Sequence, residues 1–243
     1  MLSTTVEEMN STPSWRRVAT DFRLILLFCS LVVILNSAVY ALIAAFAIHP
    51  WDLGASRSNP LGVLTAPFVH SGLDRLLSNM LFLGYFTFLF VLVNLPCQGH
   101  ERRKRSLFFA LTVLPAAVAT GVLFVVLKPG TAVGASGIAY AALGVGFGFS
   151  VTNVSHEVGI RIGYLRGTSM QREGLPAQWI VVNLFVFVTL FAMIIIQPQE
   201  FLGVGEGVDV FGHGVAFLIA LGLTIVYAMR PTHITKAGEY GDG

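Results

Sequence analysis

Six long stretches without a charged side chain constrain the fold of this chain most strongly. They cover residues 24–48, 76–96, 106–127, 129–156, 178–196 and 210–229. About 20 apolar residues in a helix suffice to cross the hydrocarbon core of a bilayer, and only 12% of the residues in the whole chain are charged. The sequence therefore predicts an all-α polytopic membrane protein with six transmembrane helices, embedded in the lipid bilayer.

The distribution of Lys and Arg predicts how the chain is oriented. Basic residues are retained in short cytoplasmic loops, and with the N-terminus inside only Arg57, Arg75 and Lys128 lie outside. We therefore expect both termini in the cytoplasm and the protein in the plasma membrane. The basic run at 101–106 fits this topology. Nucleic-acid binding is its less favoured interpretation, and no nucleic-acid partner is expected.

Topology also places three polar residues at one depth. The second, fourth and sixth spans run from outside to inside, and Asn79, Ser136 and His213 lie near their outer ends. At about 1.5 Å of rise per residue, the three depths agree within roughly 10 Å. Strongly polar side chains inside spans usually face the bundle interior or a water-filled cavity. We therefore expect these residues to meet at the outer end of the bundle.

Ser136 and His213 are residue types that perform nucleophilic catalysis together. A serine hydroxyl becomes an effective nucleophile when a histidine accepts its proton. No carboxylate lies deep in a span, so the sequence predicts a Ser-His dyad. Asp209, four residues before His213, has two interpretations: the N-cap of the sixth span or a third catalytic residue.

Peptide hydrolysis also needs donors that stabilise the negative oxygen of the tetrahedral intermediate. The backbone N–H of Ser136 and the side-chain amide of Asn79 are the candidates. Asn79 has an alternative interpretation, a hydrogen bond between two helices. The depth that Asn79 shares with Ser136 and His213 favours the catalytic one.

Small residues at helical spacing predict that the fourth and sixth spans pack closely. These residues are Gly137, Ala141, Gly144 and Gly148 in the fourth span and Gly212, Ala216 and Ala220 in the sixth. Such packing would bring a serine and a histidine on different helices within reach of each other. Tyr140 lies one turn after Ser136, so its ring is predicted to pack beside the His213 imidazole. Ordinary helix packing is the alternative for Tyr140.

Three segments resemble the rhomboid intramembrane serine proteases and occur in that family's order: FVHSGLDRLLSNM (68–80), VGASGIAYAALG (133–144) and FGHGVAFLIALG (211–222). The resemblance implies a six-transmembrane-helix rhomboid-like bundle over residues 24–230. Cytoplasmic segments at 1–23 and 231–243 are expected to flank it.

The resemblance implies a role for each matching residue. Ser136 is expected to be the nucleophile, His213 the general base and Tyr140 the ring stacked on that base. Asn79 and the Ser136 backbone are expected to form the oxyanion hole. Further matching residues are expected to support the site: His70, Gly134 and Gly137.

Three features depart from the family pattern, and the mildest is that Ala216 and Ala220 stand in the sixth span where the family usually has glycines. Arg75 stands where the family has the second histidine of its span-two motif. Three interpretations stay open: the arginine replaces that histidine as an oxyanion donor, extends outward to the lipid headgroups, or marks a weakened enzyme; the second is favoured. The Trp-Arg signature of the family's first external loop is absent from 49–62, so this loop is expected to sit differently.

The expected function is that of a serine endopeptidase cleaving single-pass or other transmembrane proteins near their outer end, without a cofactor or metal. A zinc motif is absent because Ile160 stands where His156-Glu157 would need a second histidine. One alternative is a rhomboid-like non-protease that binds or escorts membrane clients, for which Arg75 is the only support. A small transporter would require internal repeats, and none is evident. The Gly-rich stretch 197–209 is a predicted cap over the site.

Overall fold

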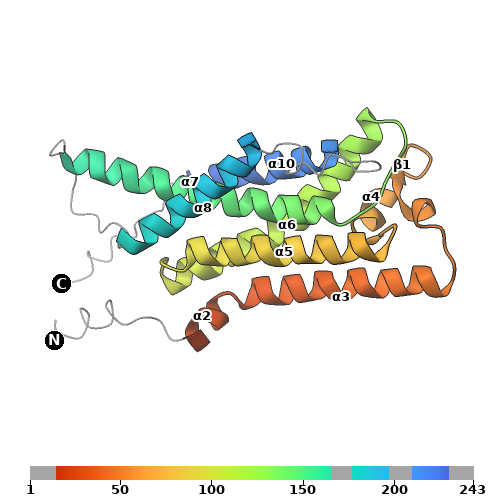
Figure 1. The fold of residues 1–243 in the computed structure, drawn as a ribbon, viewed down its shortest axis with the longest axis horizontal. Coiled ribbons are helices and arrows are strands. Elements are labelled where there is room, and N and C mark those ends of the chain that lie inside the picture. Colours follow the sequence, from red (N-terminus) through yellow and green to blue (C-terminus); the bar gives the residue numbers. More distant parts are fainter. Residues whose placement is uncertain (1–14, 166–176, 197–209, 230–243) are drawn as a thin grey trace, which may run out of the picture.

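The computed structural model of the protein describes residues 15–165, 177–196 and 210–229. Six helices in this part of the chain are long and apolar enough to cross a membrane: α3 (Arg23–Ala45), α5 (Leu73–Asn94), α6 (Gly99–Leu127), α7 (Ser136–Leu165), α8 (Ala177–Ile196) and α10 (Val210–Ala228). They extend along the long axis of the molecule (Figure 1). The chain is therefore an all-α, multi-pass integral membrane protein, as the sequence predicts.

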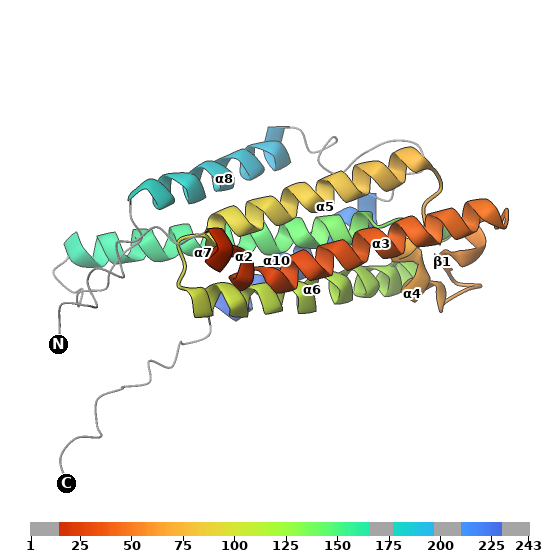
Figure 2. The same ribbon diagram turned by 90° about the horizontal axis from the view of Figure 1, so that it is seen from below.

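α7 is the centre of the bundle. In its apolar span 72% of the residues are buried, compared with 17% in α3, and α7 contacts α5, α6, α8 and α10. Figure 2 shows α8 on one flank of the bundle, next to α5. A residue on α7 is thus surrounded by other helices along most of the membrane thickness.

Two glycines of α7 allow α10 to approach it closely. A Cβ atom on Gly144 would lie 2.5 Å from the carbonyl oxygen of Phe217, and one on Gly148 would lie 2.7 Å from Cβ of Thr224. The predicted close packing of the fourth and sixth spans is therefore confirmed. Gly137 differs, because a Cβ there would lie 3.5 Å from Cβ of Ala117 and so faces α6 at an ordinary contact distance.

Short elements gather at one end of the bundle, which we call the loop end (Figure 1). They are η1 (Pro50–Leu53), β1 (Ala55–Ser56), α4 (Gly62–Thr65), η2 (Ala66–Phe68) and β2 (Thr131–Ala132). β1 and β2 pair in antiparallel fashion, with Ala55 opposite Ala132. The chain between α3 and α5 is thereby attached to the segment that leads into α7.

Side-chain contacts reinforce this attachment at the loop end. The guanidinium of Arg57 donates to the carbonyls of Val125 and Val126, at 3.4 and 3.3 Å, near the end of α6. Gly62 packs so closely on the carbonyl group of Gly54 that a Cβ atom would not fit between them. Although the family's Trp-Arg signature is absent, the loop is held in place by contacts of its own.

Polar contacts join the helices at the opposite end. Arg102 of α6 donates from Nε and Nη2 to Oδ2 of Asp21, at 3.0 and 2.7 Å, and both side chains are buried. Asp21 is the last residue of α2 (Trp15–Asp21). Arg105 donates to Oδ1 of Asn94 over 2.6 Å. Two arginines of the basic run therefore join helices together. The retention of basic residues in cytoplasmic loops does not predict these contacts.

Several predicted span boundaries are wrong: α3 ends at Ala45 rather than at 48, α7 continues to Leu165 rather than to 156, and three helices begin elsewhere. α5 begins at Leu73 rather than at 76, because Asp74 in the first turn is favourable at a helix N-terminus. α6 begins at Gly99 rather than at 106, because the arginines of its first turns have buried partners. The fourth helix begins at Ser136 rather than at 129, because β2 pairs with a strand that lies far away in sequence.

Candidate active site

Ser136 begins α7 directly after a turn that requires glycine. Gly134 has a φ of +126°, a conformation that residues with a side chain rarely adopt. The N–H of Gly134 donates to the carbonyl of Ala66 over 2.9 Å, which attaches the turn to the loop end. The first N–H groups of a helix have no partner inside it. The backbone N–H of Ser136 therefore lies at the positive end of α7, close to its own hydroxyl.

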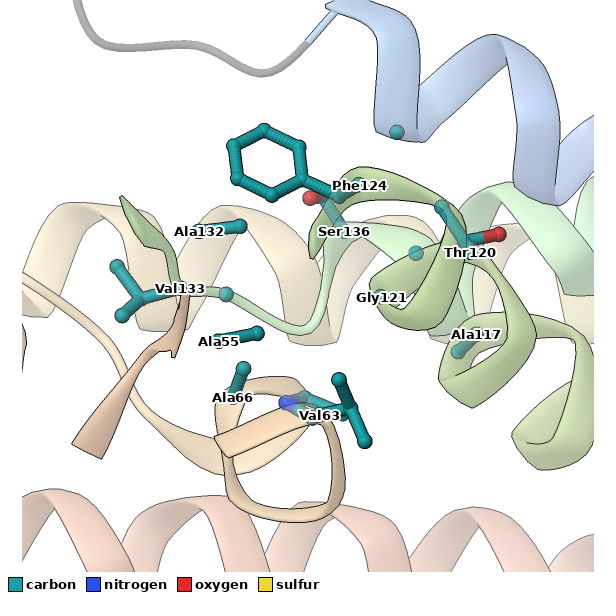
Figure 3. A pocket seen from close by; sticks show the side chains of 14 residues that line it. Ala55, Val63, Ala66, Ala117, Thr120, Gly121, Phe124, Ala132, Val133 and Ser136 are labelled. Atoms are coloured by element: carbon teal, nitrogen blue, oxygen red, sulfur yellow. The ribbon is translucent and has the colours of Figure 1, made fainter. Parts of the chain in front are cut away.

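A cavity of about 50 Å³ borders Ser136. Its walls come from α4, from α6 and from the segment before α7 (Figure 3), and Gly212 of α10 also lines it. Most of the lining residues are small: Ala55, Ala66, Ala117, Gly121, Ala132, Gly134, Ser136, Gly137 and Gly212. The serine hydroxyl thus borders a small and mainly apolar cavity.

His213 reaches this region from α10. Its buried imidazole stacks on the ring of Tyr140, with ring centroids 4.2 Å apart and planes 9° from parallel. Tyr140 lies one turn after Ser136 on α7, so the stack places His213 beside the first turns of α7. Gly212, the residue before His213, lines the same cavity as Ser136. The packing of α10 on α7 therefore brings the predicted nucleophile and base to one place.

Asn79 reaches the same place from α5. Its amide nitrogen Nδ2 lies 3.9 Å from the point where a Cβ atom on Gly134 would stand, and Oγ of Ser136 lies 3.8 Å from that point. The amide and the hydroxyl therefore border one small space next to Gly134. A substrate oxygen in this space would be within reach of both.

Residues 57–230 match the Rhomboid domain, and this range is well over half of the chain. The chain belongs to the rhomboid family. Rhomboids are generally serine proteases that act inside the membrane, although some rhomboid-like proteins are inactive. No curated protein and no solved structure matches the chain.

His70 occupies a buried position in this rhomboid, with 1% of its surface exposed. It precedes α5 and lies outside the membrane-spanning helices. Burial lowers the pKa of His70 to about 4; the backbone carbonyl of Phe68 opposes this shift, and the positive charge of Arg75 adds to it. The imidazole is therefore neutral at pH 7, and one of its two nitrogens is a hydrogen-bond acceptor. That acceptor lies next to Asn79, because Nε2 of His70 is 3.2 Å from Nδ2 of Asn79.

Arg75 lies one helical turn before Asn79 on α5 and is half-buried. Its positive charge acts on His70, so it is close to the group that contacts Asn79. The three interpretations of Arg75, as an oxyanion donor, as a residue that extends to the headgroups or as the mark of a weakened enzyme, stay predictions. Asp209 and the predicted cap at 197–209 lie outside the described residues. Within the described ranges, no three His, Cys, Asp or Glu side chains are grouped so that they could hold a metal ion.

The contribution of α6 to the cavity was not predicted from the sequence. Ala117, Thr120, Gly121 and Phe124 all line it. These residues recur at steps of three and four, which is the spacing of one helix face. Small residues on one face of the third span were therefore the signal that could have predicted this wall. The contact between His70 and Asn79 had no comparable signal, because His70 precedes the helix.

Proposed function

We propose that this rhomboid is a serine endopeptidase that cleaves transmembrane segments of other membrane proteins, single-pass proteins among them. Ser136 is the nucleophile and His213 is the general base. The observation that carries the proposal is the Tyr140–His213 stack, with its ring planes 9° from parallel. The stack supports a dyad because it fixes the imidazole plane one helical turn from the serine on α7.

In the proposed reaction, Oγ of Ser136 attacks the carbonyl carbon of the scissile peptide bond while His213 accepts the hydroxyl proton. The carbonyl electrons move onto the oxygen and form a tetrahedral oxyanion. His213 then donates the proton to the leaving nitrogen, the C–N bond breaks, and an acyl-enzyme remains. Water that has lost a proton to His213 attacks the acyl carbon, and Ser136 leaves with that proton. These steps need no cofactor.

The proposed oxyanion hole consists of Nδ2 of Asn79 and the backbone N–H of Ser136. Their support is the common space next to Gly134 that Asn79 and the Ser136 hydroxyl border. Donors held in place before the reaction stabilise the transition state because they need not reorganise when charge develops. The helix N-terminus at Ser136 favours a negative charge at the same point.

The cavity beside Ser136 supports a preference for a small substrate side chain. A volume of about 50 Å³, with walls that are mostly alanine and glycine, favours a small side chain over a large one. We assign this cavity to a substrate residue next to the scissile bond.

We also propose that the loop end faces the outside of the plasma membrane, with both termini in the cytoplasm. The basic residues of α2 and α6, at the opposite end, support this orientation. Cleavage then occurs near the outer end of the substrate helix. The protease domain covers residues 24–230, with cytoplasmic segments at 1–23 and 231–243.

Single cysteines test this orientation. They are introduced at 57 or at 103 into a chain lacking Cys29 and Cys97. Only the cysteine at 57 should react with an impermeant thiol reagent in intact cells.

A fluorophosphonate probe tests the chemistry directly, because it labels only an activated serine. The purified wild-type chain should be labelled and should cleave a reconstituted single-pass substrate, and Ser136→Ala should do neither. Labelling that persists in Ser136→Ala would contradict the assignment of the nucleophile.

A second candidate function is that of a rhomboid-like protein that binds or escorts membrane clients without cutting them. It rests on Arg75, whose charge stands where the family has a histidine. This function requires client capture by the wild-type chain with no cleavage and no labelling by the probe. The same two assays therefore separate the candidates.

A further inference from the structure

The amide of Asn79 lies between a buried imidazole and the space in front of Ser136. On one side, Nδ2 is 3.2 Å from Nε2 of His70. On the other side, Nδ2 borders the space next to Gly134 that the Ser136 hydroxyl also borders. An amide nitrogen carries two hydrogens, so it can serve both sides at once.

The chemistry of the two nitrogens decides which one donates. Nδ2 of Asn79 has no free lone pair for a hydrogen bond, so Nε2 of His70 must be the acceptor. The proton of the neutral ring then lies on Nδ1, which is buried and forms no full hydrogen bond. The Phe68 carbonyl acts on the same ring, and a carbonyl oxygen interacts favourably only with a ring N–H. If the amide were turned over, its oxygen would face the ring and both amide hydrogens would point away from His70.

We propose that His70 is a positioning residue, whose Nε2 accepts one hydrogen of the Asn79 amide and thereby directs the other hydrogen toward the oxyanion. This inference rests on the proposed protease function. A free asparagine amide rotates about its last side-chain bond, which leaves its donor poorly aimed. The contact with a rigid, buried ring removes that freedom. The amide donor is then already in place when negative charge develops on the substrate oxygen.

The acceptor lone pair on which this role depends is present at physiological pH. Burial and the nearby Arg75 both keep the proton off His70. A protonated ring would present an N–H to the amide instead, and the two donors would repel each other. The positive charge near His70 therefore supports its positioning role.

A pair of substitutions separates positioning from bulk packing. His70→Gln keeps an acceptor oxygen near the place of Nε2, whereas His70→Phe keeps a ring but has no acceptor. Both are measured in proteoliposomes with a single-pass fluorogenic substrate, and kcat and KM are determined separately. We expect His70→Phe to lower kcat about 10-fold with KM changed less than about 2-fold, and His70→Gln to keep kcat within about 3-fold of the wild type.

A double-mutant cycle with Asn79→Ala identifies the route of the effect. If His70 acts through Asn79, adding His70→Phe to Asn79→Ala should cause no further loss of kcat. His100→Phe, at an exposed position at the other end of the bundle, is the control for introducing a phenylalanine. Melting temperatures in detergent show whether each variant is folded.

Three outcomes would overturn the proposal. Wild-type kcat in His70→Phe, equal losses in His70→Phe and His70→Gln, or a full additional loss in the Asn79→Ala background would each assign His70 a merely structural role. A wild-type chain that cleaves no substrate would overturn the proposed function, and this inference with it. An active wild type with unaffected His70 variants would overturn this inference alone.

Discussion

The ring of Tyr140 and the imidazole of His213 lie face to face, with centroids 4.2 Å apart and planes 9° from parallel. The two residues come from α7 and α10, the helices that also pack through Gly144 and Gly148. The plane of the imidazole is thus set by an aromatic face that belongs to the same helix as Ser136.

Substitutions of Tyr140 test whether this face orients the base. Because the contact involves the ring and not the hydroxyl, Tyr140→Phe should keep kcat within about 2-fold of the wild type. Tyr140→Ala should lower kcat about 5-fold, since a stacked contact contributes roughly 1 kcal/mol. Initial cleavage rates of the two variants at saturating substrate give the comparison. Equal rates in both variants and the wild type would reduce the stack to ordinary packing.

The dyad predicts a pattern of losses that do not add. Ser136→Ala and His213→Ala should each reduce cleavage at least about 10³-fold, while expression and membrane insertion stay unchanged. The double variant should be no slower than either single variant, because the two side chains act as one unit. Substantial cleavage in Ser136→Ala would contradict the protease assignment.

Gly134 and Gly130 offer a matched pair for testing the space in front of Ser136. Both have a positive φ, so alanine should strain either backbone by about 1 to 2 kcal/mol. Only at Gly134 would the new methyl group lie near Ser136 and Asn79, since nothing lies within 4 Å of a Cβ on Gly130. Gly134→Ala should therefore lower kcat/KM about 10²-fold, and Gly130→Ala only a few-fold. Equal kcat/KM values in the two variants would place the oxyanion elsewhere.

Arg75 can be tested against Asn79 in one assay. We expect Arg75→Ala to keep its cleavage rate within a few-fold, because a long basic side chain near a helix end usually extends toward the headgroups. Arg75→His should maintain or raise the rate. Asn79→Ala should lower it about 10²-fold. A loss in Arg75→Ala as large as that in Asn79→Ala would instead make the guanidinium an oxyanion donor.

His70 should make the stability of the protein depend on pH. Its pKa is about 4 when folded and about 6.5 when unfolded. Between these values only the unfolded chain binds the proton, so the free energy of unfolding falls as the pH drops from 6.5 toward 4. The loss should be on the order of 2 kcal/mol. Melting temperatures at pH 7 and pH 4.5 should differ less in His70→Gln than in the wild type, and His100→Gln should behave like the wild type.

Counting helical turns was enough to predict that three residues of the candidate site lie close together. Ser136, Asn79 and His213 each lie on a span that runs in the same direction, so their sequence positions alone predict a common depth. The stripe of small residues likewise predicts the close approach of α7 and α10. These features depend on regular helices, whose geometry is fixed by the chain itself.

The remainder depends on contacts between segments that are not periodic. Ala55 pairs with Ala132 across a large separation in sequence, and a two-residue strand has no pattern that could predict its partner. His70 meets Asn79 because the chain turns between η2 and α5, and the residues of that turn have no helical periodicity. The apolar composition of residues 129–135 therefore led to a predicted fourth span that begins too early. These residues instead form a strand and a glycine turn.

Ser136, Tyr140 and His213 all belong to α7 and α10, whereas α3 and α8 are among the least buried spans, with 17% and 18% of the residues in their apolar windows buried. Under the proposed function, a substrate helix that contacts α3 or α8 would touch neither of the two helices that carry the proposed dyad. Substitutions should accordingly accumulate unevenly during evolution. We expect α3 and α8 to adapt to bilayers of different thickness and to clients of different shape, while glycine at positions 144 and 148 resists replacement.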